Sequence, residues 1–250
     1  MLNFRNTSVA FLVLLAIFTL ASIYSVTGYV LMVILASSYL ILLIYGSASI
    51  QSGFYLKALC RKSTKEKIIA LTFDDGPDPE ITPKVLDLLK KHQIQAIFFC
   101  TGKNIPDNHE ILIRMVKEGH LIGNHSYEHP VLFDLWSSRQ MLEDLNRAEN
   151  TIAFASGQRP DWFRPPYGVT NPTVSRVVLK KNYRVMGWSI RSFDTSIKDP
   201  ERIMERIIKR WHPGGILLMH DTNEKVIEVL KMVIEYARNK GYQFVRADKY

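Results

Sequence analysis

The stretch IIALTFDDGP, residues 68–77, decides the fold, because an uncharged β-rich run ends there in two adjacent carboxylates, a glycine and a proline. Neighbouring side chains on a strand point to opposite faces. One carboxylate can therefore ligate a cation while the other stays free to accept a proton, which makes Asp74 and Asp75 candidate site residues. The alternative interpretation is an ordinary Asp-Asp-Gly-Pro surface turn.

Beyond this stretch, short β-rich runs alternate with amphipathic helical patterns to the end of the chain. Strands are predicted over residues 68–73, 96–100, 121–124, 184–189, 215–219 and 243–246. Helices are predicted between them over residues 82–92, 109–118, 137–154, 171–181, 200–211 and 224–239. This alternation predicts a parallel α/β fold, in which functional side chains collect at the carboxyl ends of the strands.

The amino-terminal part of the chain is apolar, since residues 6–56 contain no charged side chain and show no amphipathic spacing. One membrane-spanning helix needs about 20 apolar residues. The run therefore predicts a transmembrane hairpin with spans at Val9–Val26 and Tyr29–Tyr45 and a turn at Thr27-Gly28. A signal peptide cleaved near Ala21-Ser22 is the alternative, although the second apolar run would still anchor the protein.

The 250 residues carry a formal net charge of +8, and 47% of them are hydrophobic. This content excludes a largely disordered chain and allows one sizeable core. The charge is compatible with nucleic acid, an anionic membrane or an acidic polymer as partner. The sequence has no zinc-finger or helix-turn-helix pattern and no arginine-rich tail, so we expect no nucleic-acid partner. Cys60 lies beside the apolar segment and Cys100 ends a predicted strand, so we expect no disulfide between them.

A basic segment follows the apolar run and contains Lys57, Arg61, Lys62, Lys65 and Lys67. We therefore expect three parts: a membrane anchor at residues 1–56, a basic juxtamembrane linker at 57–67 and an α/β domain at 68–250. The positive-inside rule places the basic segment in the cytoplasm, and a hairpin would place both termini there too. A domain that works outside the cell would need the opposite orientation, so the sequence leaves the side of the membrane open.

Two histidines four residues apart, His125 and His129, follow a predicted strand. Imidazoles at this spacing lie on one side of a helical turn and can reach one cation near 2.1 Å. Together with Asp75 they make three protein ligands and leave a coordination position for water, as in catalytic rather than structural zinc sites. Two histidines with no metal are the alternative interpretation.

Three further segments combine rigid or apolar backbone with reactive side chains. The first, RPPYG at residues 164–168, is stiffened by two prolines and could present Arg164 in a fixed direction, with a short polyproline recognition stretch as the alternative. The second is WSIRSFD at residues 188–194. The third is GILLMHD at residues 215–221, in which a buried strand would deliver His220 to a cleft, with a hydrogen-bonded structural histidine as the alternative.

Five segments in chain order resemble the motifs of the NodB-type polysaccharide deacetylases, carbohydrate esterase family 4, namely residues 72–77, 125–129, 164–168, 188–194 and 218–220. The resemblance extends over about Ile68–Tyr250. It implies a distorted (β/α) barrel with fewer than eight strands, preceded in this chain by the transmembrane hairpin.

The resemblance also implies roles for individual side chains. Asp74 would be the general base and His220 the general acid. Arg164 would orient and ionise Asp74, and Asp194 would support the imidazolium of His220.

The remaining implied residues bind the metal and the substrate. A divalent metal, Zn²⁺ first and Co²⁺ or another divalent ion otherwise, would have as its ligands Asp75, His125 and His129. The Tyr167 backbone amide would help to bind the oxyanion, and Trp188 and Leu218 would line the acetyl pocket. Thr195 stands where many members have tryptophan, which affects the expected shape of the sugar groove.

The sequence as a whole predicts a hydrolase that removes N-acetyl groups from an amino-sugar glycan at a bacterial cytoplasmic membrane. Peptidoglycan, a chitin-like oligomer and a lipid-linked amino sugar are the candidate substrates, and membrane lipid is an expected partner. A lipid-linked sugar suits a domain on the cytoplasmic side, beside its basic segment. The alternative is a catalytically inactive, carbohydrate-binding membrane protein with the same fold.

Overall fold

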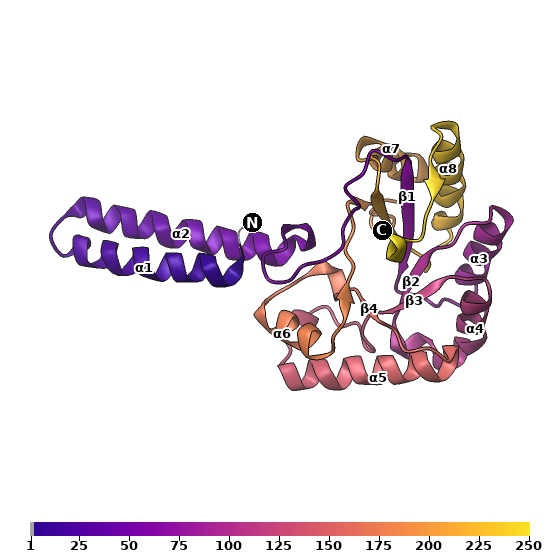
Figure 1. Ribbon diagram of the computed structural model, residues 1–250, viewed down its shortest axis with the longest axis horizontal. Coiled ribbons are helices and arrows are strands. Elements are labelled where there is room, and N and C mark those ends of the chain that lie inside the picture. The colour runs from indigo at the N-terminus through magenta and orange to yellow at the C-terminus, as the bar shows by residue number, and fades with distance from the viewer. Residues whose placement is uncertain (1–2) are drawn as a thin grey trace.

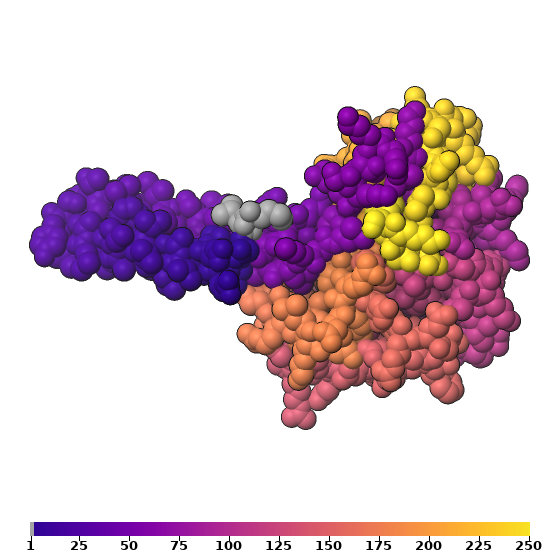
Figure 2. Space-filling model, viewed as in Figure 1, coloured from indigo at the N-terminus to yellow at the C-terminus, as the bar shows by residue number. Residues whose placement is uncertain are grey.

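The computed structural model describes residues 3–250 and consists of a helical hairpin that projects from an α/β body (Figure 1). The hairpin contains α1 (Phe4–Ser22) and α2 (Val26–Ala48). Both helices are long and apolar enough to cross a membrane. In the space-filling view the outer part of the hairpin stands clear of the body (Figure 2), and most of its large apolar side chains are exposed while none is buried.

The turn of the hairpin lies at Ile23–Ser25, so its predicted position at Thr27-Gly28 is wrong. Ser25 starts α2 because its hydroxyl accepts a hydrogen bond from the Gly28 amide at 3.1 Å, which satisfies a free amide of the first turn. Gly28 lies inside α2, where a Cβ would come within 2.5 Å of the Ala21 carbonyl carbon. The glycine therefore permits close packing of the two helices and does not make a turn.

A parallel sheet forms the centre of the body, with strand order β5-β4-β3-β2-β1-β7-β6, and β8 pairs with β1 outside this path. The strands are β1 (Ile68–Asp74), β2 (Ile97–Cys100), β3 (Leu121–Asn124), β4 (Trp162–Phe163), β5 (Arg184–Val185), β6 (Ile190–Arg191), β7 (Gly215–His220) and β8 (Gln243–Phe244). Seven strands thus form the continuous path of an incomplete barrel, which confirms the predicted fold class.

Helices cover the outside of this sheet, in the positions that the sequence predicts to within a few residues (Figure 1). They are α3 (Ile81–Lys91), α4 (His109–Lys117), α5 (Ser138–Ser156), α6 (Pro172–Lys180), α7 (Pro200–Lys209) and α8 (Lys225–Asn239). Successive side chains of β1 point to opposite faces of the sheet. Ile69, Leu71 and Phe73 pack in the main core cluster with residues of α3 and α8, so Thr72 and Asp74 point to the other face, toward the barrel interior.

Of the predicted strand over residues 184–189, only β5 at Arg184–Val185 is strand, and the next strand, β6, begins at Ile190 at the opposite end of the sheet. The chain leaves the sheet between them because Gly187 has other partners: its carbonyl accepts from Arg164 and its amide donates to Leu59. The two-residue strand β4 was not predicted. It pairs with β3 and β5 and thereby places Arg164 at the barrel interior.

Backbone from the basic segment bridges the open side of the barrel, between β5 and β7. The Leu59 amide donates to the Val185 carbonyl at 2.8 Å, and the Lys62 amide donates to the Gly214 carbonyl at 2.8 Å. Cys60 packs at the edge of the second core cluster, which also includes Trp188. Cys60 and Cys100 are both free thiols.

Candidate active site

The predicted site residues meet at the carboxyl ends of neighbouring strands. Asp74 ends β1 and lies in register with His220, which ends β7, and His125 directly follows β3. A cavity of about 240 Å³ opens at this edge. Eight of the predicted residues line it: Asp74, Asp75, His125, His129, Tyr167, Trp188, Leu218 and His220. Arg164 and Asp194 are fully buried behind the lining residues.

Three lining side chains have the geometry of a metal site. His125 Nε2 and His129 Nε2 are 3.2 Å apart, and Asp75 Oδ1 lies 3.5 Å from the first and 3.4 Å from the second. Two ligands held 2.1 Å from one ion in tetrahedral geometry are about 3.4 Å apart. The three donor atoms therefore suit a single small divalent cation, and their nitrogen and oxygen chemistry suits zinc.

The backbone that carries the two histidines is not a helical turn, so that part of the prediction is wrong. Residues 125–130 form an irregular loop, in which Ser126 and His129 have positive φ values of 67° and 51°. Asp144 of α5 holds this loop because its carboxylate accepts from the amides of Tyr127 and Glu128 at 2.8 and 3.0 Å. A long-range contact with α5, and not local helix geometry, brings the imidazoles together.

His125 is oriented and kept neutral by its surroundings. Its Nδ1 lies 2.7 Å from the Arg164 carbonyl oxygen, so Nδ1 donates there and Nε2 turns toward Asp75. Burial, followed by the charge of nearby His129, lowers the pKa of His125 to about 3. A neutral imidazole with a free Nε2 is the form that binds a metal.

Asp74 has a different environment from its neighbour Asp75. Arg164 Nη1 donates to Asp74 Oδ1 at 2.6 Å, and the same guanidinium donates to Thr72 and to the Met186 and Gly187 carbonyls. Burial raises the pKa of Asp74, while the charge of Arg164 acts in the opposite direction. The outcome is a buried carboxylate, fixed by a fully buried arginine, that faces the metal ligands and can accept a proton.

His220 is paired with Asp194 in the same manner. His220 Nδ1 lies 2.7 Å from Asp194 Oδ1, and the His220 amide donates to Asp194 Oδ2 at 2.8 Å. Burial lowers the pKa of His220, but the hydrogen bond and charge of Asp194 outweigh it and raise the pKa to about 8. The imidazole is therefore largely protonated at neutral pH and can donate a proton from Nε2.

Strained backbone lies in the walls of the cavity and next to them. Asp75, Ser126, His129, Tyr167 and Phe193 all have positive φ, which costs non-glycine residues about 1–3 kcal/mol each and is typical of functional sites. Tyr167 is 45% exposed and lies on the rim. Gly168, at φ 71°, lies so close to the Trp188 ring that a Cβ there would overlap it. Thr195 lines the exposed side of the cavity.

Sequence reasoning missed three side chains of this region. Asp144 is a buried acid on an amphipathic helix, a pattern that could have drawn attention to it. Asp221 is buried against Gly76, accepts a hydrogen bond from Thr82 and has its pKa raised by burial to about 7. Arg191 lines the cavity itself, yet nothing local distinguishes it from a surface arginine on a short strand.

The chain is similar to known polysaccharide deacetylases. Residues 61–186 match the family described as polysaccharide deacetylase. The peptidoglycan-N-acetylmuramic acid deacetylase PdaA of Bacillus subtilis is 36% identical over 190 residues, which cover 74% of this chain and 72% of the relative. The chain therefore belongs to the polysaccharide deacetylase family, the NodB-type carbohydrate esterases of family 4.

Two solved structures that resemble this chain, one of a deacetylase and one of a pseudoenzyme, share the fold but differ in activity. Peptidoglycan deacetylase PdaC from Bacillus subtilis has a TM-score of 0.69 at 35% identity, covering 74% of this chain and 89% of that structure. A family 4 pseudoenzyme from Bacillus anthracis has a TM-score of 0.70 at 28% identity, covering 76% of this chain and 67% of that one. Because the fold also occurs in a pseudoenzyme, activity has to be judged from the site residues.

Proposed function

We propose that this protein is a metal-dependent N-deacetylase of an amino-sugar glycan. The observation that carries the proposal is the convergence, in one small cavity, of a three-donor metal cluster, a buried aspartate and a histidine that is hydrogen-bonded to a second buried aspartate. A bound divalent ion, Zn²⁺ or alternatively Co²⁺, would be held by Asp75, His125 and His129. Such an ion lowers the pKa of water toward about 7 and polarises a carbonyl group.

The chain's own side chains would then move the protons. Asp74, held by Arg164, would accept a proton from the attacking water. His220, held protonated by Asp194, would donate one to the amide nitrogen, which otherwise leaves very poorly. Each such transfer typically contributes about 10²–10⁴-fold to the rate. The Tyr167 amide would stabilise the developing oxyanion, a type of contact worth about 3 kcal/mol, while Trp188 and Leu218 would enclose the acetyl methyl group.

We infer that the hairpin is a membrane anchor, and its contacts with the body then fix the distance of the site from the lipid. Thr170 donates from its amide to the Ser47 carbonyl at 3.1 Å and accepts from the Ser47 hydroxyl at 2.7 Å. Tyr167 is three residues away, and three residues span at most about 11 Å. The rim of the cavity would therefore lie close to the membrane surface, where a lipid-linked amino sugar or membrane-proximal peptidoglycan is within reach.

The test is acetate release by the metal-loaded full-length protein from chito-oligosaccharides, peptidoglycan fragments and lipid-linked N-acetylated sugars, with and without chelator. We expect release that the chelator stops. Asp74→Asn should lose at least about 10²-fold in kcat and still bind metal, whereas Asp75→Ala should lose metal affinity. Asp74→Asn protein that stays active would remove Asp74 as the base.

The alternative, an inactive carbohydrate-binding protein, makes the opposite prediction. It requires glycan binding by the metal-loaded wild-type chain without acetate release from any substrate. The family contains a pseudoenzyme, so this outcome has a precedent in the fold. All five groups that the chemistry needs are present in this cavity, which is why we favour the enzyme.

A further inference from the structure

A short loop after the candidate metal site, residues 131–135, exposes apolar side chains to solvent. In this apolar loop Val131, Leu132 and Leu135 are 73%, 59% and 70% exposed, and the loop begins two residues after the metal donor His129. Exposed large apolar residues on the helices of the body occur singly, as Phe154 does on α5. Single residues of this kind are ordinary, whereas three within a loop of five residues indicate a contact surface.

The apolar loop is held from inside, so its exposed side chains have a firm support. A 3₁₀ turn covers Phe133–Leu135. Phe133 is buried in the second core cluster, which also contains Ile50, two residues after α2. The side-chain amide of Asn171 donates to the Asp134 carbonyl at 2.6 Å. The loop therefore needs no refolding to meet a partner.

The same contacts place the apolar loop beside the end of the hairpin. Thr170 precedes Asn171 and is hydrogen-bonded to Ser47 of α2, and its hydroxyl donates to the Gly46 carbonyl at 3.2 Å. In Figure 1, α6, which follows Asn171, belongs to the part of the body nearest the hairpin. Two neighbouring residues thus connect the apolar loop to the last turn of α2.

The hairpin defines the level at which a bilayer surface would lie. The 23 residues of α2 span about 35 Å at about 1.5 Å each, which matches a hydrocarbon core of about 30 Å. Tyr29 in the first turn and Tyr45 in the last turn are both exposed, as in the aromatic belts at the two surfaces of a membrane. With Tyr45 among the headgroups, the apolar loop lies at about the same depth.

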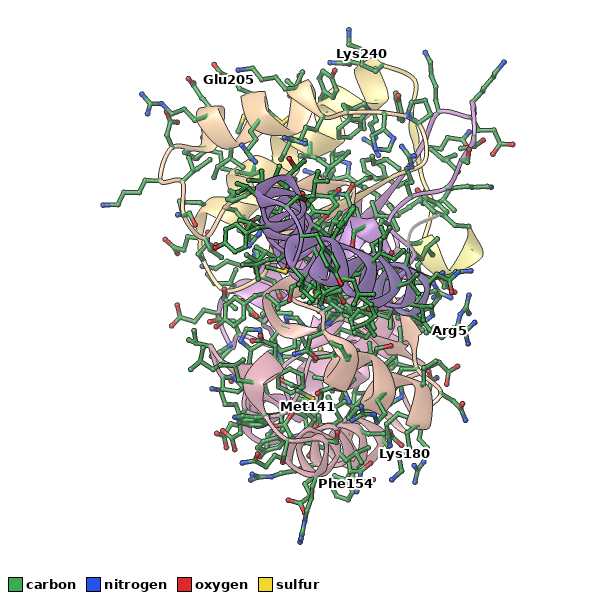
Figure 3. The ribbon with its side chains drawn as sticks, turned by 90° about the vertical axis from the view of Figure 1, so that its left-hand side faces the viewer. Arg5, Met141, Phe154, Lys180, Glu205 and Lys240 are labelled. Carbon is green, nitrogen blue, oxygen red and sulfur yellow. The ribbon has the colours of Figure 1, made fainter. Side chains whose placement is uncertain are left out.

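The surroundings of the apolar loop favour lipid as its partner. None of residues 131–135 lines the catalytic cavity, so a sugar held there would leave their side chains uncovered. Arg176 of α6 donates to Ser138 Oγ at 3.5 Å, three residues beyond the loop. Figure 3, which looks along the hairpin toward the body, shows Lys180 of α6 on the part of the body below the hairpin. Cationic side chains next to apolar ones are typical of surfaces that lie in the interface of an anionic membrane.

We propose that the apolar loop inserts Val131, Leu132 and Leu135 into the interface of the bilayer that holds the hairpin. The inference rests on the proposed membrane anchor and deacetylase, and it gives the catalytic body a membrane contact of its own. Because the loop adjoins His129, this contact holds the mouth of the cavity at the headgroups and limits tilting of the body about the hairpin. Asp134 lies between the apolar residues, and the cost of a carboxylate in hydrocarbon confines the loop to the interface.

The experiment measures the depth of nitroxide labels on the full-length protein in nanodiscs of phosphatidylcholine and phosphatidylglycerol. Labels are attached to three variants, Leu132→Cys in the apolar loop, Leu12→Cys in the hairpin and Phe154→Cys on α5. The unaltered protein, labelled in parallel, gives the background from Cys60 and Cys100. Collisions with oxygen, which concentrates in lipid, and with a water-soluble nickel chelate report the depth of each label.

Phe154 is the matched control for the apolar loop. It is 93% exposed, and it lines a hollow with His109, which begins α4 on the side of the body away from the hairpin (Figure 1). We expect the label at position 12 to collide mainly with oxygen and the label at 154 mainly with the chelate. The label at 132 should collide with the chelate at least about threefold less often than the label at 154.

A second substitution tests whether the apolar side chains cause the insertion. Leu135→Asp, added to the protein labelled at position 132, should raise collisions with the chelate toward the level seen at 154, because a carboxylate opposes insertion. Phe154→Asp in the same labelled protein should leave them unchanged. Both positions are exposed, so the fold should persist, and thermal unfolding checks this.

Failure of the loop contact and failure of the anchor give different results. A label at position 12 in hydrocarbon, with the label at 132 as accessible to the chelate as that at 154, would refute the loop contact and leave the anchor and the deacetylase intact. A water-exposed label at position 12 would overturn the anchor and this inference with it. A label at 132 that is shielded only after a chito-oligosaccharide is added would assign the loop to glycan instead. None of these measurements needs turnover, so an inactive protein would still decide the loop contact.

Discussion

Replacing Asp194 with asparagine tests the link between the buried carboxylate and the acid role of His220. Burial lowers the pKa of His220, but the hydrogen bond and charge of Asp194, with the charges of Asp74 and Asp75 added, raise it from 6.5 to about 8. In the wild type, the His220 amide donates a hydrogen bond to Asp194 Oδ2. In the variant, the same amide would bond to the asparagine side-chain oxygen and so fix the orientation of that side chain. The amide NH₂ group would then face Nδ1, which disfavours the imidazolium and lowers the pKa to 6.5 or below.

The consequence appears on the alkaline side of the pH profile. A group that must be protonated is active below its pKa and inactive above it, so wild-type kcat/KM should fall as the pH rises through about 8. At pH 7.5 such a group is roughly three-quarters protonated, whereas one with a pKa of 6.5 is roughly one-tenth protonated. Asp194→Asn should therefore lose at least about eightfold at pH 7.5 and regain part of that loss at pH 6.

The assay is acetate release between pH 5.5 and 9.5, with metal content and thermal unfolding measured at each end. Ser192→Ala is the matched control, because it removes the hydroxyl that donates to Asp194 Oδ1 at 2.8 Å and keeps the carboxylate. This variant should leave the pH at which activity falls unchanged or move it to a slightly higher pH. An alkaline limb that Asp194→Asn does not shift would show that His220 is not the titrating acid.

Three further changes test other parts of the site. Asp144→Ala removes the acceptor of two loop amides and should weaken zinc affinity about 10–100-fold, as measured by competition with a chelating dye, while exposed Glu143→Ala on the same helix should not. Gly187→Ala would place a Cβ 2.6 Å from Cys60 Sγ and should destabilise the body by about 1–3 kcal/mol in denaturant titrations, and a variant as stable as wild type would contradict the packing. Chelation should abolish activity while far-ultraviolet circular dichroism stays native, because the metal donors lie on loops beyond buried strands, and Zn²⁺ should restore turnover.

Local sequence patterns were sufficient to predict the strands and helices in which an apolar run or an amphipathic period extends over several residues. β1, β2, β3 and β7 are mostly apolar runs, and the helices carry clear amphipathic periods. The two-residue strand at Trp162–Phe163 has no such pattern, because it is too short and its place depends on β3 and β5. The break after Val185 likewise depends on contacts made by Gly187 with Arg164 and Leu59, which are distant in the chain.

The candidate site shows the same division between local and long-range information. The spacing of His125 and His129 correctly associates the two imidazoles, but the helical turn inferred from it is wrong, since Asp144, fifteen or more residues away in sequence, shapes the loop. Arg191 became visible as a site residue only when β6 was placed next to β7.

The backbone of residues 59–62 that bridges β5 and β7 has a practical consequence for producing the enzyme without its hairpin. A fragment that starts at Ile68 would lose the Leu59 and Lys62 hydrogen bonds and would expose the edge of β5. Exposed strand edges promote aggregation. Ile50 is also buried, in the cluster that contains Trp188. A fragment for soluble expression should therefore begin at Ser49. It lacks α1 and α2 but retains residues 59–62, which bridge β5 and β7.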